Sequence, residues 1–324
     1  MLKKYVTLCN IKHVKEMTLR YNKDNLLRTK AYGDFFIRNN EIYWAYLASM
    51  VSRNAGWNMS DLWSRPYQVL LTKEQQNHLF TTYERANWLI FSDAFPQLLI
   101  YEWSKKLKEP LFYLLTYFKV SKWMINEWEA FWETGNKERL LQALIINEQN
   151  LIQRPVIEAP FFKREIFNSF SYVLQERLHF SSVLFPTKKG QIYGRTVKQF
   201  NKVEKRIQLG KELAWILFHS REKNDIHSFF NDVPFSGSRR DYQKWQKGSF
   251  PFTPRMNDIY PYILHSDDKR EDWSKSITYD PTNYIDKKMM KPMKYDLTGW
   301  YEHKQKQIVV TASLYLKLKN LIHK

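Results

Sequence analysis

Apolar side chains recur at three- and four-residue spacing along much of the first 225 residues, a pattern typical of α-helices. The stretch 41–53 shows it clearly, because Trp44, Leu47 and Val51 would share one helix face. Further helices are predicted over 72–83, 109–118, 121–132, 137–153, 157–180 and 197–220, with a loop or short hairpin at 185–194. Only 9 of the 324 residues are glycine, which favours long helices over a turn-rich β architecture. We therefore predict an all-α, mainly helical fold.

Local signals set the expected helix ends. Gly56 predicts that the first of these helices stops near it, because glycine is favoured just past a helix end. Thr72 lies three residues before Gln75, which predicts a capping box at a helix start. Pro96 is expected to kink or divide the helix that covers 84–104, since proline cannot donate a backbone hydrogen bond.

The composition changes after residue 225. Six of the 12 prolines lie within 232–292, which predicts a loop-rich segment packed on the core, because its aromatic side chains need burial. A last helix is predicted over 308–322, docked onto the core rather than lying on a membrane surface. The sequence thus divides into a basic N-terminal segment (1–30), a helical core (31–225) and a loop-rich extension with a basic C-terminal helix (226–324), expected to form a single domain.

The positive charge is concentrated at the two ends. The chain carries a formal net charge of +18, and residues 1–30 and 285–324 each contribute +6. Nucleic acid, anionic lipid and acidic proteins all respond to such a field, so the charge alone does not choose among them. Lysine dominates the C-terminal segment, and diffuse lysine also serves solubility.

Cysteine use and hydropathy indicate the compartment. Cys9 is the one cysteine, which excludes an intramolecular disulfide and is typical of a reducing environment. Lys12 interrupts the first apolar run too early for a signal peptide, and no stretch approaches the roughly 18 uncharged apolar residues of a membrane span. We expect a cytoplasmic protein without a transmembrane segment.

The segment 84–104 is apolar on every side of a helix and yet carries several polar side chains, which predicts that they point into the protein. Similar polar groups interrupt apolar helices near 52–54 and 147–150. If the three helices meet, their carboxylates could act as general acids or bases. The candidate catalytic residues are Glu84, Asp93 and Glu148, and the candidate ligand-binding residues are Arg53, Asn54, Arg85, Asn87, Gln97, Asn147 and Gln149.

The same groups have a structural interpretation. Buried ion pairs that fix the packing of helices produce the same pattern as a catalytic cluster. Arg53 in particular would lie at a helix C-terminus, where a cation interacts favourably with the helix dipole. The sequence alone leaves both interpretations open.

A second candidate site is the loop 236–242, SGSRRDY. Gly237 allows consecutive backbone amides to turn towards an anion, and two arginines follow at once. The candidate anion-binding residues are Ser236, Gly237, Ser238, Arg239 and Arg240. In the alternative interpretation, Arg239 and Asp241 pair with each other across a simple surface turn.

Familiar catalytic motifs are absent from the sequence. It contains no glycine-rich dinucleotide fingerprint, no complete nucleotide-binding loop, no HExxH and no GxSxG. The eight histidines are scattered, so no metal site is predicted. The sequence identifies no reaction and no cofactor, and it does not decide whether the protein is an enzyme.

Four stretches together resemble the YppC-like proteins of Bacillus relatives, the family known as domain of unknown function 2515. They are WAYLASMVSRNAGWNMSDL (44–62), ERANWLIFSDAFPQLLIYEWS (84–104), ALIINEQNLIQRPVI (143–157) and SGSRRDY (236–242). The chain departs from the family pattern at Ser49, where the family has histidine, and at 234–239, where the family has PHTGSR. The resemblance implies an intracellular bacterial protein and supplies no reaction, cofactor or catalytic residue.

Two functions from different classes fit these features. In the first, an internal polar pocket binds a small or polymeric anionic ligand. In the second, a non-enzymatic scaffold binds nucleic acid or an acidic partner through its basic ends. The sequence gives no oligomeric state.

Overall fold

The computed structural model describes residues 2–159, 182–196, 199–261, 263–266 and 270–322. The predicted mainly helical fold is confirmed, with one small two-stranded sheet in the described part of the chain. The helix predicted over 157–180 lies almost entirely outside the described residues.

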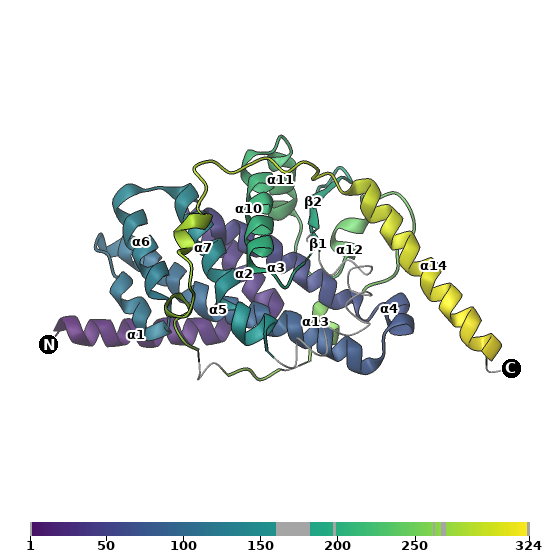
Figure 1. Cartoon of the computed structure of the whole chain (residues 1–324), viewed down its shortest axis with the longest axis horizontal. Helices are drawn as coiled ribbons and strands as arrows, with labels where there is room; N and C mark the ends of the chain where they lie inside the picture. Colours follow the sequence, from purple (N-terminus) through teal and green to yellow (C-terminus); the bar gives the residue numbers. More distant parts are fainter. Residues whose placement is uncertain (1, 160–181, 197–198, 262, 267–269, 323–324) are drawn as a thin grey trace. The chain divides into compact units, whose positions relative to one another are not determined.

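Figure 1 shows the order of the elements along the chain. The long helices are α1 (Leu2–Tyr21), α2 (Asn25–Arg38), α3 (Tyr43–Asp61), α5 (Lys73–Leu107), α6 (Lys122–Thr134), α7 (Lys137–Leu151), α10 (Val203–His219), α11 (Lys223–Asp232) and α14 (Thr298–Ile322). The short ones are α4 (Arg65–Leu70), η1 (Phe112–Phe118), η2 (Gln153–Ile157), α12 (Arg240–Gln243), α13 (Met256–Ile259), η4 (Trp273–Lys275) and η5 (Pro281–Tyr284). The strands are β1 (Ser182–Pro186) and β2 (Ile192–Thr196), an antiparallel hairpin where a loop or hairpin was predicted.

The chain forms two compact units, each built from separate segments. Unit 1 comprises Met1–Ser49, Arg85–Val156 and Leu264–Lys288, and unit 2 comprises Met50–Glu84, Ile157–Ile263 and Met289–Lys324. The division into residues 1–30, 31–225 and 226–324 stays a prediction.

Aromatic rings stack on one another in the core of unit 1. Trp128 of α6 is fully buried and stacks on Phe112 of η1 at 5.7 Å and on Tyr101 of α5 at 5.4 Å. Helix α6 begins at the cap Ser121, whose hydroxyl accepts the Met124 amide proton, and ends at Gly135 in the left-handed conformation. Helix α6 packs against α7, and polar residues carried by α5 and α7, such as Asp93 and Asn147, are buried.

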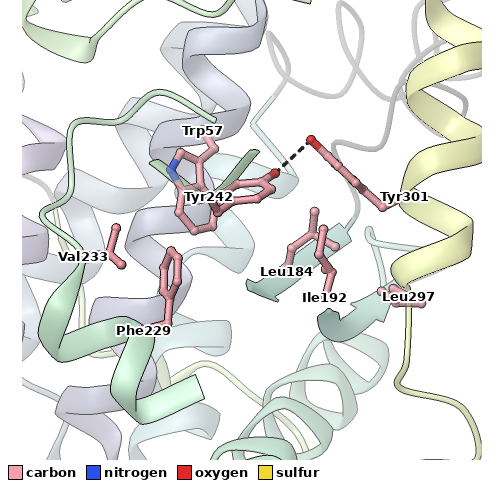
Figure 2. Packing of buried hydrophobic residues seen from close by; sticks show 8 residues of the cluster. All are labelled: Trp57, Leu184, Ile192, Phe229, Val233, Tyr242, Leu297 and Tyr301. Carbon is pink, nitrogen blue, oxygen red and sulfur yellow. Dashed lines mark hydrogen bonds between the residues drawn. The ribbon is translucent and has the colours of Figure 1, made fainter. Parts of the chain in front are cut away.

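The core of unit 2 joins residues from distant parts of the sequence. Figure 2 shows eight of them, which are Trp57, Leu184, Ile192, Phe229, Val233, Tyr242, Leu297 and Tyr301. The Tyr242 hydroxyl donates a hydrogen bond to the Tyr301 hydroxyl at 3.2 Å within this cluster. The hairpin therefore contributes Leu184 and Ile192 to a core that α3, α11 and α14 complete.

Helix α3 does not end near Gly56, so that prediction is wrong. The helix continues to Asp61, because Trp57 and Met59 beyond the glycine are fully buried. Burying two such side chains contributes about 1.5–3 kcal/mol each, which exceeds the roughly 1 kcal/mol that a glycine costs inside a helix.

Helix α5 begins with the predicted capping box and then runs for 35 residues. The Thr72 amide donates to the Gln75 side chain at 2.9 Å, and the Gln75 amide donates to the Thr72 hydroxyl at 3.2 Å. Pro96 lies inside the helix and does not divide it. Buried Phe95 and Leu98 on either side stabilise the continuous helix against the cost of the missing hydrogen bond.

Helix α14 begins ten residues before the predicted start at 308. Its first half is docked through four buried residues, which are Tyr301, Gln305, Ile308 and Ala312. From residue 313 to residue 321 the side chains are exposed, apart from the partly buried Leu316. The predicted segment 308–322 thus contacts the core through Ile308 and Ala312, while its second half is exposed. None of the helices in the described ranges is long and apolar enough to cross a membrane.

Candidate functional site

Asp93 is the centre of a buried hydrogen-bond network in unit 1. Its Oδ2 atom accepts from Gln97 Nε2 at 2.6 Å and from Asn147 Nδ2 at 2.7 Å. Arg270 Nη1 lies 3.5 Å from Asp93 Oδ1. Two amides and a cation thus satisfy a carboxylate that is 2% exposed, as a buried charge requires.

The two amide side chains are themselves held in place. Trp128 Nε1 donates to Gln97 Oε1 at 2.8 Å, and Trp273 Nε1 donates to Asn147 Oδ1 at 2.9 Å. The Ser121 hydroxyl donates to the same Asn147 oxygen at 3.2 Å. Because each amide oxygen has a donor, each NH₂ group is directed towards Asp93.

Glu148 follows Asn147 on α7 and has a different environment. Its carboxylate accepts from Trp44 Nε1 at 3.1 Å and from Gln149 Nε2 at 3.0 Å. Within the described residues it forms no ion pair, and its side chain remains partly accessible to water. Burial raises the pKa of Glu148 to about 7, while the two hydrogen bonds oppose the rise. A carboxyl group with this pKa can both donate and accept a proton near neutral pH.

Tyr32 of α2 is influenced by the charges of both carboxylates. Its ring contacts Trp44 at 5.4 Å and Phe91 at 5.0 Å, and its buried hydroxyl has no hydrogen-bond partner among the described residues. Burial raises the pKa of Tyr32 well above its ordinary value, and the charges of Glu148 and Asp93 add to the rise. The phenol is therefore a proton donor at every physiological pH.

Arg28 supplies a cation to this group of residues. It lies one helical turn before Tyr32 and is 1% exposed. Its charge opposes the rise in the pKa of the Tyr32 hydroxyl without cancelling it. Its Nη1 donates to the Asn22 backbone oxygen at 3.3 Å and to the Asn22 side-chain oxygen at 3.0 Å. We refer to Arg28, Tyr32, Asp93 and Glu148 as the Tyr32 cluster.

The Tyr32 cluster contains two of the three predicted carboxylates. Asp93 and Glu148 both act on Tyr32 within unit 1, whereas Glu84 is buried in unit 2. The cation beside Asp93 is Arg270, which is not among the candidate ligand-binding residues. Sequence reasoning missed Arg28, Tyr32 and Arg270, because they lie in segments without a polar-in-apolar pattern; the four-residue spacing of Arg28 and Tyr32 is the one available signal.

Arg85 and Asn87 are partly exposed on α5. Arg85 Nη1 donates to the Ser266 backbone oxygen at 2.9 Å, and its guanidinium stacks over the Trp88 ring at 5.0 Å. Gln149 reaches the cluster only through its hydrogen bond to Glu148.

Arg53 and Asn54 bind backbone in unit 2. Arg53 donates to the Val233 oxygen at 3.0 Å and to the Phe230 oxygen at 3.1 Å. Asn54 donates to the Ser182 oxygen at 2.8 Å and accepts the Leu184 amide at 3.0 Å, which ties α3 to β1. Arg53 lies within α3 rather than at its C-terminus, so the predicted helix-dipole role is wrong.

Arg239 forms a buried ion pair with Asp61. Its Nε lies 2.7 Å from Asp61 Oδ2, while Nη1 donates to the Tyr242 hydroxyl at 2.6 Å and Nη2 to Asn58 Oδ1 at 2.8 Å. Burial raises the pKa of Asp61 to about 6, and the Arg239 charge opposes the rise. Because Arg239 is 2% exposed, its guanidinium faces the interior of unit 2 rather than solvent.

The loop 236–242 uses its own hydrogen-bond donors. Asp241 accepts from the Ser236 amide at 3.1 Å and from Trp57 Nε1 at 3.1 Å. The alternative pairing of Asp241 with Arg239 is therefore wrong, since Arg239 pairs with Asp61. The backbone amides of residues 238–240 also donate hydrogen bonds to hydroxyl groups. One of them is the 3.0 Å bond from the Arg239 amide to the Thr253 hydroxyl.

Gly237 is tightly packed in this loop, whereas Arg240 is exposed. Gly237 has φ +77°, and a Cβ atom there would lie 2.6 Å from the Met256 Cβ, so the position requires glycine. Ser238 is buried and donates to the Thr253 oxygen at 2.7 Å. Arg240 is exposed and stacks over Phe252 at 5.3 Å. The loop is a packed turn whose donors serve unit 2.

Comparison with known proteins places the chain in a family. A family model described as "Protein of unknown function (DUF2515)" matches residues 20–302. The chain belongs to this family. It is 44% identical over 299 residues to "Uncharacterized protein YppC" of Bacillus subtilis (strain 168), which covers 92% of each chain. No solved structure matches. The family match confirms the resemblance, and its description assigns no function to the Tyr32 cluster or to the Arg239–Asp61 pair.

Metal ligation has no geometric basis in the part of the chain that the structure describes. No three His, Cys, Asp or Glu side chains lie close enough together there to hold an ion. The side chains of the Tyr32 cluster can supply hydrogen bonding by the Tyr32 phenol and proton exchange at Glu148.

Glu148→Gln is expected to change how stability depends on pH. The folded-state pKa of about 7 lies above the ordinary value of 4.5, so the stability contributed by protonated Glu148 is lost as pH rises through 7. The amide has no charge to desolvate. As the pH rises from about 5 to about 8, the free energy of unfolding of the variant should increase by about 2–3 kcal/mol relative to that of the parent. Urea unfolding at both pH values measures this, with the exposed Glu129→Gln as control; parallel pH profiles for parent and Glu148→Gln would contradict it.

Proposed function

We propose that the protein binds a small anionic ligand at the Tyr32 cluster, with Glu148 taking up a proton when the ligand binds. The observation that carries this proposal is the buried Tyr32 hydroxyl without a hydrogen-bond partner among the described residues. A buried hydroxyl in a polar setting normally has a partner, and an anionic oxygen would accept its proton.

The charges of the neighbouring residues favour the binding of an anion at low pH. Arg28 and Arg270 are positive, and Asp93 is negative and paired with Arg270. When Glu148 is ionised these four groups are neutral in sum, and when it is protonated they carry one positive charge. Since its pKa is about 7, this change falls within the physiological range. Partial exposure of Glu148 allows the proton to come from solvent.

Calorimetric titration of the full chain with inorganic phosphate and with acetate tests the proposal. Affinity should be about tenfold higher at pH 6 than at pH 8, because the protonated fraction of Glu148 falls by about that factor. Heats in two buffers of different ionisation enthalpy should report proton uptake. Tyr32→Phe should weaken binding about tenfold or more, because it removes a hydrogen bond to a charged group. Glu148→Gln should bind with little pH dependence.

Matched variants separate this site from general effects. Tyr113→Phe is the control for the phenol, since Tyr113 is half exposed on η1. Binding that is unchanged by Tyr32→Phe, or heats indistinguishable from dilution for both anions at pH 6, would rule the site out.

The alternative function, a scaffold that binds nucleic acid or an acidic partner through its basic ends, is supported by exposed lysines. Lys12 and Lys15 on α1 and Lys317 and Lys319 on α14 are exposed, as contact with a polyanion requires. No ligand chemistry beyond charge distinguishes these lysines from solubilising residues. The Tyr32 cluster, which combines charge with a buried donor, is therefore the better-supported site.

A further inference from the structure

The second half of α14 carries a row of apolar side chains that the described part of the chain leaves uncovered. Val310, Leu314, Leu318 and Leu321 are 56%, 55%, 59% and 70% exposed. Their spacing of four, four and three residues places them along one side of the helix, and we refer to them as the apolar stripe. The docked residues of the first half, including Ile308 and Ala312, lie on another side.

An exposed row of this kind on a helix end indicates a binding surface. Contiguous apolar patches on a protein surface mark interaction sites more often than isolated apolar residues do. Water alone does not stabilise such a helical segment, because short helices depend on packing of an apolar face. A partner that covers the stripe would therefore stabilise this part of the helix.

The charge beside the stripe selects the partner. The sequence contains no aspartate or glutamate after Glu302. By helical geometry, Lys306 and Lys317 lie along one flank of the stripe and Lys304 lies along the other, whereas Lys319 lies on the far side of the helix. Two copies of this helix would repel each other, whereas an anionic surface would be attracted to both flanks.

We propose that the apolar stripe of α14 inserts into the surface of an anionic lipid membrane, with the helix lying in the membrane plane. Leucines would enter the acyl boundary, and lysines on both flanks would extend to the phosphate headgroups. Exposed Tyr315 lies near the edge of the stripe, and tyrosine is enriched at membrane interfaces. No described helix can span a bilayer, which is consistent with a helix that lies on it.

Duplex nucleic acid fits this surface less well. Phosphates would bind the lysines, but the stripe would stay exposed to water. A flat bilayer surface satisfies the leucines and the lysines together.

Vesicle flotation of the full chain tests the proposal. Vesicles of phosphatidylcholine with about one-third phosphatidylglycerol should carry the protein, and pure phosphatidylcholine vesicles should carry several-fold less. A Leu314→Gln, Leu318→Gln, Leu321→Gln variant should lose about tenfold or more of the partition to anionic vesicles, because the apolar contribution is removed. A Lys317→Gln, Lys319→Gln variant should lose the preference for anionic lipid.

A matched control keeps the number of apolar residues constant. Leu19, Ile37 and Leu107 are 70%, 68% and 58% exposed on α1, α2 and α5, and their replacement by glutamine should leave flotation unchanged. Circular dichroism of each variant shows whether the fold is kept.

Three results would overturn the proposal. Flotation of the folded leucine variant at the parental level would exclude the stripe. A dimer by light scattering that the leucine variant converts to monomer, without flotation of the parent, would make a second copy the partner. Binding of the parent to duplex DNA but not to vesicles, with a steep salt dependence that the leucine variant retains, would assign the lysines to nucleic acid. Each result concerns α14 alone, so it leaves anion binding at the Tyr32 cluster untouched.

Discussion

Replacement of Arg239 by methionine is expected to lower the free energy of unfolding by about 3–5 kcal/mol, because it leaves the Asp61 carboxylate buried without its cation. Asp61 is 3% exposed, and the described hydrogen bonds to its carboxylate both come from Arg239. The variant also removes the donors to Asn58 and Tyr242. Methionine fills similar volume, so the loss measures the missing charge and hydrogen bonds rather than a cavity.

The effect should depend on pH in a defined direction. The Arg239 charge opposes the burial that raises the pKa of Asp61 to about 6, so its removal raises that pKa further. Protonated Asp61 tolerates burial, and ionised Asp61 does not. The deficit should therefore be larger at about pH 8 than at about pH 5.

Urea unfolding at the two pH values measures the change. Arg240→Met is the control, because Arg240 is exposed and adjacent, and it should stay within about 0.5 kcal/mol of the parent. A double variant, Asp61→Leu with Arg239→Met, should recover much of the loss, since it removes both buried charges. If Arg239→Met and Arg240→Met unfold alike, the ion pair does not stabilise the fold.

Asp93→Ala should destabilise the protein by a similar amount, about 3–5 kcal/mol. The carboxylate receives the amide protons of Gln97 and Asn147 and lies beside Arg270, so its removal takes away the acceptor that three buried groups share. Asp93→Asn should lose less stability, because its side-chain oxygen can still accept a hydrogen bond from one of the amides.

Thermal and urea unfolding of both Asp93 variants provide the measurement. Asp34→Ala is the control, because the Asp34–Lys30 pair is largely exposed on α2 and such pairs contribute about 1 kcal/mol or less. A melting temperature for Asp93→Ala equal to that of the parent would show that the network is not structural.

The sequence determined most of the helices, because their signals are local. The three- and four-residue spacing predicted α3, α6, α7 and α10, and Thr72 with Gln75 predicted the start of α5. Polar residues inside an apolar helix predicted that Asp93 and Gln97 are buried, since a helix with no polar face has no side to present to water.

Only the tertiary structure decided where helices continue and which polar groups meet. Gly56 and Pro96 are local stop signals, yet burial of neighbouring side chains outweighs them. Arg270 and Asp93 are far apart in sequence, as are Arg239 and Asp61, so no spacing rule links either pair. Short-range patterns fix backbone preference and burial, whereas the partner of a buried charge depends on packing between distant segments, which is where the chemistry of this protein is decided.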